Sequence, residues 1–449
     1  MFDYADKIQL LIKVAAEKYK LNRQDYSRYN VKRGLRNPDG TGVLAGLTSI
    51  GEVRGYIIDD GEKVPVDGDL LYRGIRVNDL VEHCRKENRL GFEEVIFLIL
   101  FGVLPDREML NQFTSILSSL RPLPSHFTED IILKSPSPDI MNKLARCILA
   151  SYSFDKTPND ISLPNLMRQC IELIARMPTM TAYAYQAKNH YYEGQSLIIH
   201  SPQENLSAAE NFLHMLRPNH EYTREEVEIL DLMLMLHAEH GGGNNSAFAC
   251  RVVSSSGTDT YSAIAAAVGS LKGPKHGGAN AKVMAMMEDI KENVKNWDDL
   301  DEVEYYLEQI IEKKAGDKSG LVYGMGHAVY TLSDPRAILL KEKAKELAAQ
   351  KGFGAEYALY EAVETLTPKV FAAVKGDSKV ISANVDMYSG FVYKMLGIPP
   401  ELYTPLFVMS RIVGWSAHRI EEVISGGRII RPAYKSVCPH FTYVPIDKR

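Results

Sequence analysis

The chain has 449 residues, 45% of them hydrophobic and 24% charged, the proportions of an ordinary globular protein with room for two or three domains or one large enzyme. Its formal net charge is −5 and it has no long basic run, so binding of nucleic acid or of an anionic membrane has no electrostatic support. No stretch approaches the roughly 18 apolar residues of a membrane-spanning helix. The five cysteines are scattered without a CxxC pair, which predicts a cytoplasmic protein with neither a zinc cage nor a disulfide framework.

The first regular elements that the sequence predicts are short strands. Residues 51–74, GEVRGYIIDDGEKVPVDGDLLYRG, contain Gly-Glu and Asp-Gly turn signals, which predict one or two small hairpins. Apolar residues at helical spacing follow at 91–102 and at 162–175, so we expect a helix in each of these segments.

Two later helices carry a complete start signal. Ser207 and Glu210 in NLSAAENFLHMLRP form a capping box, in which each side chain accepts the free backbone N–H of the other residue. Thr223 and Glu226 repeat this box in YTREEVEILDLMLMLHAEHGGGNN. The helix that they open runs with apolar spacing to about Glu239, and the glycines that follow predict its end.

A stretch of small residues, TYSAIAAAVGSLKGP at 260–274, predicts a helix that packs tightly among others and ends at Gly273–Pro274. Helical periodicity continues at 280–292, 336–350, 388–396 and 404–424. Helices therefore account for most of the chain. We expect an all-α fold with minor short β-hairpins near the N-terminus.

Four polar clusters interrupt this helical pattern, each at the end of an expected helix. They are LHAEHGGGNNS with His237 and His240, GPKHGGAN with His276, GMGHAVYTLSDPRA with His327 and Arg336, and SANVDMYSG with Asp386. Glycines beside three of the histidines remove side-chain bulk, so the backbone there is able to approach a ligand closely. Histidines, an aspartate and several arginines at element ends indicate a site for a polycarboxylate.

Taken singly, each cluster has a plain structural interpretation. A histidine near a helix C-terminus, such as His237, is usually a packing residue that interacts with the helix dipole, and Asp386 alone is most often a helix N-cap. The pair His237 and His240 lacks the third ligand of a zinc site. GMGHAV lacks the third glycine and the βαβ context of a dinucleotide-binding loop. The combination of the clusters, not any one of them, favours a ligand site.

The segments GPKHGGAN, GMGHAVY…DPRA and NVDMYSG closely resemble the three signature segments of the citrate synthase family, and the similarity covers roughly residues 40–435 in the family's order. It implies a citrate-synthase-like two-domain helical fold and a homodimer, with the active site in the cleft between the domains. The implied division is a large domain over 1–278, a small domain with much of the coenzyme A site over 279–397, and a return to the large domain with a C-terminal arm over 398–449. Residues 1–40 remain open between a helix that clasps the other subunit and simple surface.

Carried over by motif, the resemblance implies that His276, His327 and Asp386 are the catalytic residues. Asp386 would abstract the methyl proton of acetyl-CoA, which requires a base within hydrogen-bond reach. His276 would donate a hydrogen bond to the thioester oxygen and stabilise the enol or enolate, a role that suits a neutral imidazole at a helix N-terminus. His327 would polarise the ketone of oxaloacetate, and citryl-CoA would then be hydrolysed.

The remaining residues implied by the resemblance bind substrates. A guanidinium pairs with a carboxylate through two parallel bonds, and Arg431 would come from the other subunit. Ser246 matches a hydroxyl position that would orient His276. Oxaloacetate would be bound by His240, Arg336, Arg411 and Arg431, and coenzyme A by Val322, Gly324, Met325, Gly326 and by Lys375 or Lys379. No metal or cofactor is expected, since acetyl-CoA is a substrate.

The resemblance leaves the acyl group open. Gly241 and Met387 stand where many relatives have other residues, and both lie next to the expected catalytic groups. A single methylene changes discrimination by only about 1–3 kcal/mol, so a 2-methylcitrate synthase that uses propionyl-CoA is the nearest alternative. A non-catalytic metabolite-binding relative is a further alternative, and the presence of all three catalytic residues counts against it. A citrate-cleaving lyase domain would need a nucleotide-binding region that this chain lacks.

Overall fold

The computed structural model describes residues 4–60, 62–376 and 380–449, and the chain forms two compact units, Met1–Leu47 and Thr48–Arg449. The first unit contains helix α1 (Tyr4–Lys18), helix α2 (Arg23–Arg28) and a 3-10 turn, Arg33–Leu35. The side chain of Asn22 caps α2 by accepting the backbone N–H of Gln24. The role of residues 1–40 stays open.

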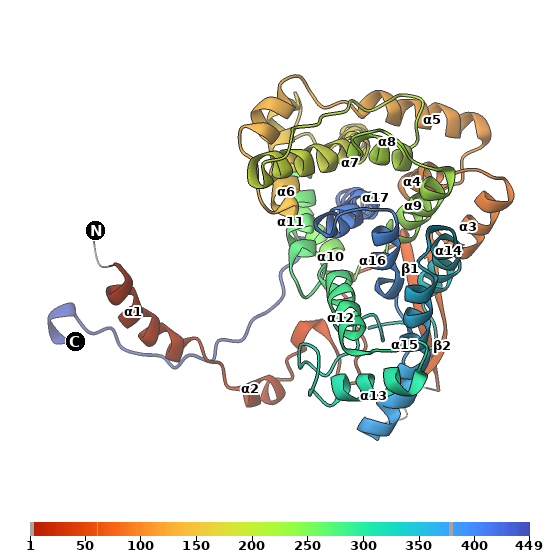
Figure 1. Ribbon diagram of the computed structural model, residues 1–449. Coiled ribbons are helices and arrows are strands. Elements are labelled where there is room, and N and C mark those ends of the chain that lie inside the picture. Colours follow the sequence, from red (N-terminus) through yellow and green to blue (C-terminus); the bar gives the residue numbers. More distant parts are fainter. Residues whose placement is uncertain (1–3, 61, 377–379) are drawn as a thin grey trace. The chain divides into compact units, whose positions relative to one another are not determined.

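The second unit begins with the expected hairpins, which form one small antiparallel sheet in the order β1-β2-β3 (Figure 1). Its strands are β1 (Gly51–Asp59), β2 (Glu62–Tyr72) and β3 (Ile75–Arg76). The buried hydroxyl of Tyr72 donates to the carbonyl of Met235 at 2.9 Å, so the sheet is joined to the last turn of a helix that reaches the site. A Cβ on Gly68 would lie 2.0 Å from the Ser333 carbonyl, so only glycine fits where β2 meets that loop.

The rest of the second unit is helical, which confirms the all-α fold class. Its α-helices are α3 (Val77–Lys86), α4 (Phe92–Phe101), α5 (Arg107–Leu120), α6 (Ile140–Ser151), α7 (Leu163–Glu193), α8 (Ala208–Leu216), α9 (Arg224–His237), α10 (Asn245–Ser254), α11 (Thr260–Lys272), α12 (Ala279–Asn293), α13 (Leu300–Ile311), α14 (Pro335–Lys351), α15 (Gly354–Lys375), α16 (Asp386–Met395) and α17 (Tyr403–Ile424). A short π-helix (Thr128–Leu133) and 3-10 turns (Tyr152–Phe154, Pro400–Leu402 and Ile446–Lys448) complete the secondary structure. The expected domain boundaries at residues 278 and 397 stay a prediction.

The start signals act as predicted. Both capping boxes form, with reciprocal bonds at Ser207 and Glu210 before α8 and at Thr223 and Glu226 before α9. Helix α9 ends at His237, two residues earlier than the spacing indicated. Helix α7, in contrast, runs far beyond the predicted end at 175, because its second half buries polar residues that break the simple apolar periodicity.

Helix α17 is the centre of the second unit. Figure 1 shows it between α7 on one side and α4, α9, α10 and α11 around it, and each of these helices is in contact with it. Trp415 and most other side chains of α17 are buried, since the helix is surrounded by neighbours. Helix α17 also carries Arg411 and Arg419, so two cations are buried on this helix.

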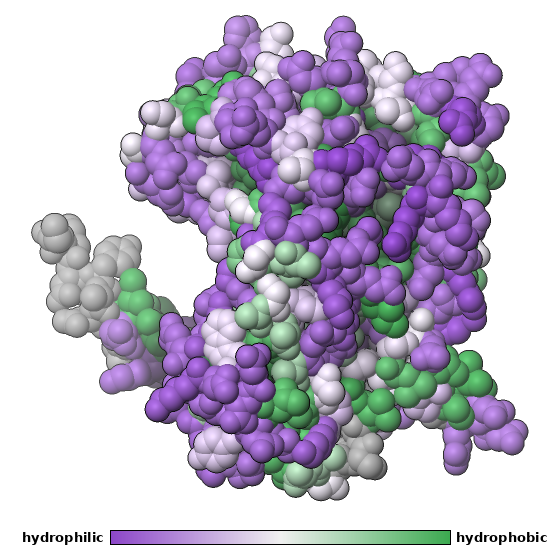
Figure 2. All heavy atoms as spheres, turned by 45° about the vertical axis from the view of Figure 1, so that its right-hand side comes forward, coloured by the Kyte–Doolittle hydropathy of each residue, from purple (hydrophilic) through white to green (hydrophobic). Residues whose placement is uncertain are grey.

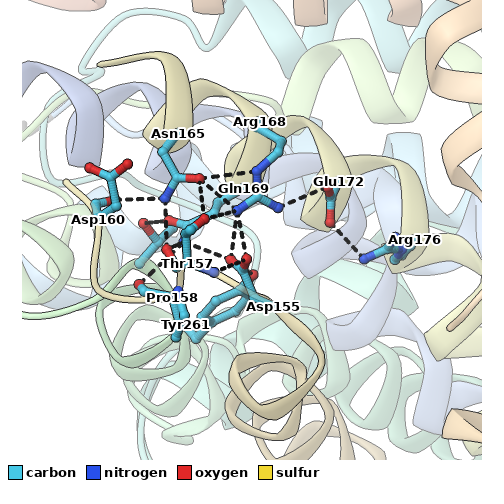
Figure 3. Close-up of polar contacts among 11 residues, drawn as sticks. Asp155, Thr157, Pro158, Asp160, Asn165, Arg168, Gln169, Glu172, Arg176 and Tyr261 are labelled. Atoms are coloured by element: carbon cyan, nitrogen blue, oxygen red, sulfur yellow. Dashed lines mark hydrogen bonds and ion pairs between the residues drawn. The ribbon is translucent and has the colours of Figure 1, made fainter. Parts of the chain in front are cut away.

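A polar cluster ties α7 and α11 to the loop before α7 (Figure 3). The Asp155 carboxylate accepts hydrogen bonds from Arg168 at 2.7 and 2.8 Å, from Gln169 at 2.8 Å and from the Tyr261 hydroxyl at 2.8 Å. Burial by itself would raise the pKa of Asp155, but these bonds and the backbone N–H of Thr157 outweigh it and lower the pKa to about 2. The cluster is therefore an ionised anchor for the loop.

Figure 2 shows hydrophilic side chains over most of the visible face, with apolar residues gathered in smaller groups between them. In the described ranges 4–60, 62–376 and 380–449, no helix combines the length and the apolar character needed to cross a membrane.

Candidate active site

A cavity of about 180 Å³ lies where several helix ends meet beside α17. The end of α9, the turn before α12, the loop before α14 and the start of α16 all contribute to its wall. The structure thus brings residues from all four polar clusters together. The cavity is lined by His237, His240, Asn244, Leu271, His276, Gly277, Ala279, Asn280, His327, Arg336, Asn384, Val385, Asp386, Tyr393, Tyr403, Thr404, Phe407 and Arg411.

His276 is placed by the tight turn between α11 and α12. The backbone N–H groups of His276 and Gly277 both donate to the Gly273 carbonyl, at 2.9 and 3.0 Å, and a Cβ on Gly277 would lie 2.1 Å from the Leu271 carbonyl. The ring Nε2 of His276 lies 2.9 Å from Ser246 Oγ. Burial lowers the pKa of His276 to about 4, and the nearby Arg411 adds to this effect. The imidazole is therefore neutral at neutral pH.

The loop after α13 fixes the ring of His327. Its Nδ1 accepts the backbone N–H groups of Val329 and Tyr330 at 3.0 and 3.1 Å, so in the neutral ring the hydrogen is on Nε2. The ring stacks on Tyr330, with centroids 4.6 Å apart, and meets His240 edge-on at 5.3 Å. Burial lowers the pKa of His240 well below its ordinary value, and the Arg336 cation adds to this effect. His240 is therefore a neutral ring beside His327.

Two loops distant in sequence are joined directly behind the site. The backbone of Gly326 donates to the Ser382 carbonyl at 2.7 Å, and that of Asn384 donates to the Gly324 carbonyl at 2.8 Å. The side-chain amide of Asn384 also donates to the Gly326 carbonyl at 2.8 Å. Gly324 has φ of +82°, and a Cβ there would lie 2.9 Å from the Met387 sulfur. The segment before His327 is thus held against the segment before Asp386.

Asp386 is the first residue of α16 and does not cap it. Val385 occupies the N-cap position without a side-chain bond, and the backbone N–H of Asp386 donates to Asn384 Oδ1 at 3.0 Å. Burial raises the pKa of Asp386 to about 6, opposed by the cations Arg336 and Arg411. A carboxylate with a pKa in this range is well suited to abstract a proton at neutral pH.

Both expected arginines of this chain are buried at the cavity. The guanidinium of Arg336 donates to both oxygens of Asp334, at 3.0 and 2.8 Å, and the same carboxylate accepts the backbone N–H of Val385 at 3.2 Å. The Nε of Arg411 donates to the carbonyl of His237 at 2.5 Å. Burial lowers the pKa of Arg411 to about 10, so it remains a cation at neutral pH.

Several buried polar atoms of the cavity have no hydrogen-bond partner among the described residues. They are His237 Nδ1, His240 Nε2, Asn280 Oδ1 and Arg411 Nη2. An unpaired buried polar atom costs about 1–3 kcal/mol, so these atoms indicate a polar ligand. His237 was expected to be a packing residue, and its ring does pack on Phe407 with centroids 4.5 Å apart, but it also lines the cavity.

Some residues proposed from the sequence lie away from the cavity in this single chain. Arg431 is exposed in the segment after α17. Lys375 is exposed and donates to the Ile311 carbonyl at 3.2 Å, and Lys379 lies outside the described residues. The coenzyme A residues Val322, Gly324, Met325 and Gly326 flank the cavity without lining it. Throughout the described parts of the chain, no cluster of three His, Cys, Asp or Glu side chains is placed to hold a metal.

A buried polar chain behind His240 was not foreseen. Glu239 Oε1 accepts from His418 Nε2 at 2.9 Å and from the backbone N–H of Gly241 at 2.5 Å, and Arg251 donates to His418 Nδ1 at 2.7 Å. The only local signal was an acidic residue between two histidines in HAEH. The structure also adds Asp334, Asn244 and Asn384 to the surroundings of the site.

The helical fold and this cavity are those of a condensing acyltransferase. The chain belongs to the citrate synthase family, because the family described as "Citrate synthase, C-terminal domain" matches residues 38–433.

Relatives with two different names are about equally similar to the chain. The citrate synthase of Synechocystis sp. is 34% identical over 385 residues, covering 85% of this chain and 89% of the relative. The 2-methylcitrate synthase 1 of Corynebacterium glutamicum is 33% identical over 427 residues, covering 93% and 98%. Sequence identity therefore does not decide the acyl group.

Solved structures of the family share the fold. The citrate synthase of Pyrobaculum aerophilum has a TM-score of 0.73 and 30% identity, covering 92% of this chain and 97% of that chain. That of Thermoplasma acidophilum, solved as a ternary complex with carboxymethyl coenzyme A and oxaloacetate, has a TM-score of 0.75 and 27% identity, covering 93% and 99%.

Proposed function

We propose that the chain condenses acetyl-CoA with oxaloacetate and water to give citrate and CoA. The observation that carries this proposal is the meeting of His276, His327 and Asp386 in one cavity, where the pKa of the carboxyl is raised to about 6 and the pKa of His276 is lowered to about 4. Two buried arginines line the same cavity, which therefore suits a substrate with two carboxylates.

The proposed chemistry uses each group once. Asp386 takes a proton from the methyl group of acetyl-CoA, while a neutral His276 donates a hydrogen bond to the thioester oxygen and stabilises the enol or enolate. The new carbanion carbon attacks the ketone carbon of oxaloacetate, and His327 donates to the ketone oxygen as it gains charge. Water then cleaves the thioester of citryl-CoA, which releases citrate and the CoA thiol.

Oxaloacetate would be held by His240, Arg336 and Arg411. Their support is the set of buried, unpaired polar atoms on the cavity wall and the two guanidinium groups in it. Arg431 would complete the site from a second copy of the chain, which makes the active form a homodimer. Its position in an exposed C-terminal segment is compatible with such an exchange.

Coenzyme A would bind against residues 322–326, with Lys375 or Lys379 near its phosphates, as the resemblance implies. The Thermoplasma acidophilum structure was solved with carboxymethyl coenzyme A and oxaloacetate, and these two ligands support the same substrate pair here. All the proposed steps are carried out by side chains, so we propose no metal or cofactor. The cytoplasmic location stays a prediction.

Thiol release tests the function. Purified protein is mixed with oxaloacetate and either acetyl-CoA or propionyl-CoA, with a control that lacks oxaloacetate. We expect thiol from acetyl-CoA that depends on oxaloacetate. Absence of thiol with both acyl-CoAs would refute the enzyme and leave the metabolite-binding alternative. A higher kcat/KM for propionyl-CoA would instead assign the chain as a 2-methylcitrate synthase, the activity named for the Corynebacterium glutamicum relative.

A further inference from the structure

Three polar side chains form a line of hydrogen bonds from the surface to the ring of His276. Asn245 Oδ1 lies 2.5 Å from Ser270 Oγ, Ser270 Oγ lies 3.2 Å from Ser246 Oγ, and Ser246 Oγ lies 2.9 Å from His276 Nε2. Asn245 and Ser246 open α10, and Ser270 is in the last turn of α11. Ser246 is fully buried, whereas Asn245 is exposed.

Such a line has a direction, because a hydroxyl has a single hydrogen to donate. In one direction, the one that matches the amide of Asn245 as it is placed, His276 Nε2 donates to Ser246, Ser246 to Ser270, and Ser270 to Oδ1 of Asn245. The neutral ring then has only a lone pair on Nδ1. In the other direction Ser246 donates to Nε2, so the hydrogen of the neutral ring is on Nδ1.

The two directions differ in what His276 can do. Its Nε2 is occupied by Ser246 in both, so Nδ1 is the ring nitrogen left for a substrate. Only the second direction gives Nδ1 a hydrogen to donate to a thioester oxygen. That direction requires Ser246 to accept from Ser270, and Ser270 to accept from the amide NH₂ of Asn245.

We propose that Ser270 and Asn245 are positioning residues that set the hydrogen of His276 on Nδ1 through Ser246. The inference rests on the proposed function, which requires a hydrogen on Nδ1, but the tautomer is measured without any activity. A half-turn of the Asn245 amide exchanges its oxygen and its NH₂ group, and the exposure of this side chain leaves the turn unhindered. An amide can supply the required hydrogen, and a carboxylate cannot.

Replacement of Asn245 by aspartate therefore reverses the direction of the hydrogen bonds that lead to His276. The carboxylate introduced by N245D only accepts, so Ser270 donates to it, Ser246 donates to Ser270, and His276 donates from Nε2. An acidic residue in the first turn of α10 also suits the helix dipole, so the fold is expected to persist.

The first experiment measures thiol release by Asn245→Asp and by a double variant. We expect Asn245→Asp to lower kcat by at least about 10-fold, because a lost donor to a developing oxyanion costs on the order of 100-fold when complete. Ser270→Ala removes the hydroxyl that connects Asn245 to Ser246. The kcat of the double variant Asn245→Asp with Ser270→Ala should therefore lie within about 3-fold of the kcat of Ser270→Ala alone. An electrostatic effect of the new charge would persist in the double variant.

The second experiment reads the tautomer directly and needs no activity. Nitrogen NMR of the full-length enzyme labelled at histidine distinguishes a protonated from an unprotonated ring nitrogen, and His276→Gln identifies the signal. We expect the hydrogen on Nδ1 in the wild type and on Nε2 in Asn245→Asp. The same tautomer in both proteins, or no recovery in the double variant, would overturn the proposal. If the wild type releases no thiol, the proposed function fails, while the NMR result still decides whether Asn245 and Ser270 set the tautomer of His276.

Discussion

His418 Nε2 donates to Glu239 Oε1 at 2.9 Å, and neither side chain has any exposed surface. The same oxygen accepts the backbone N–H of Gly241, directly after His240. Burial alone would raise the pKa of Glu239, but His418 and then Arg411 outweigh it, and the pKa is lowered. A buried, ionised carboxylate thus fixes the turn that carries His240 and balances the charge of Arg411.

We predict that Glu239→Ala destabilises the protein by about 3 kcal/mol, because loss of the carboxylate leaves the His418 Nε2–H without its acceptor and the charge of Arg411 without its counter-ion. The KM for oxaloacetate should rise as well, since the His240 turn loses its anchor. Urea unfolding and steady-state kinetics measure the two effects. Glu52→Ala, which removes an exposed ion pair with Arg54, is the control and should change stability by less than about 1 kcal/mol. Equal stability of both variants would contradict the argument.

Asp386→Asn should lower the rate of thiol release by about 10²–10⁴-fold, because the amide cannot accept the methyl proton. Binding of oxaloacetate, measured by calorimetry, should persist, since Arg336 and Arg411 are unchanged. Asp130→Asn is the matched control, because Asp130 is exposed and pairs only locally with Lys134. Normal turnover in Asp386→Asn would remove this residue as the base.

The activity should depend on pH through Asp386. Its carboxyl has a pKa raised to about 6, so the reactive carboxylate is lost as the pH falls through that value. His276, with a pKa lowered to about 4, stays neutral over the same range. We expect kcat/KM for acetyl-CoA to fall below about pH 6 in a pH–rate profile. A profile that stays flat down to pH 5 would contradict the assignment.

Asp155 should contribute to the stability of the fold in a way that also depends on pH, but at lower pH values than the activity does. Its pKa is lowered to about 2 in the fold, below the unfolded value of about 3.9, so the contribution is present above about pH 4 and is lost as the pH falls toward 2. Asp155→Asn should therefore cost on the order of 2 kcal/mol at pH 7 and less at pH 3, measured by urea unfolding. A cost that is the same at both pH values would show that geometry, not charge, anchors the loop.

The proposed exchange of Arg431 predicts complementation between two inactive variants. Arg431→Gln and Asp386→Asn each spoil every site in their own homodimers. In a mixed dimer, one site combines the Asp386 of one subunit with the Arg431 of the other and is intact. Refolding the two variants together should restore about a quarter of the sites. Activity no higher than the sum of the separate variants would contradict the exchange.

Local signals in the sequence predicted several helices, and the three motifs of the resemblance named His276, His327 and Asp386, which the structure brings into one cavity. Capping boxes and apolar spacing depend on residues three or four positions apart, and the start of α8 at Ser207 followed from them directly. The pairing of Glu239 with His418 depends on residues 179 positions apart, which no local pattern reports. The same holds for Ser270 beside Ser246, and for α7, whose second half becomes helical by packing among other helices.

Hydrogen bonds between residues 324–326 and 382–384 join the segment before His327 to the segment before Asp386. His327 is expected to act on the ketone and Asp386 on the methyl group, yet both side chains follow segments joined by the same backbone hydrogen bonds. The same hydrogen bonds therefore fix the position of the His327 loop relative to the start of the helix that carries Asp386. The donor for the ketone and the base for the methyl group would thus be positioned by one joined unit instead of by two separate loops.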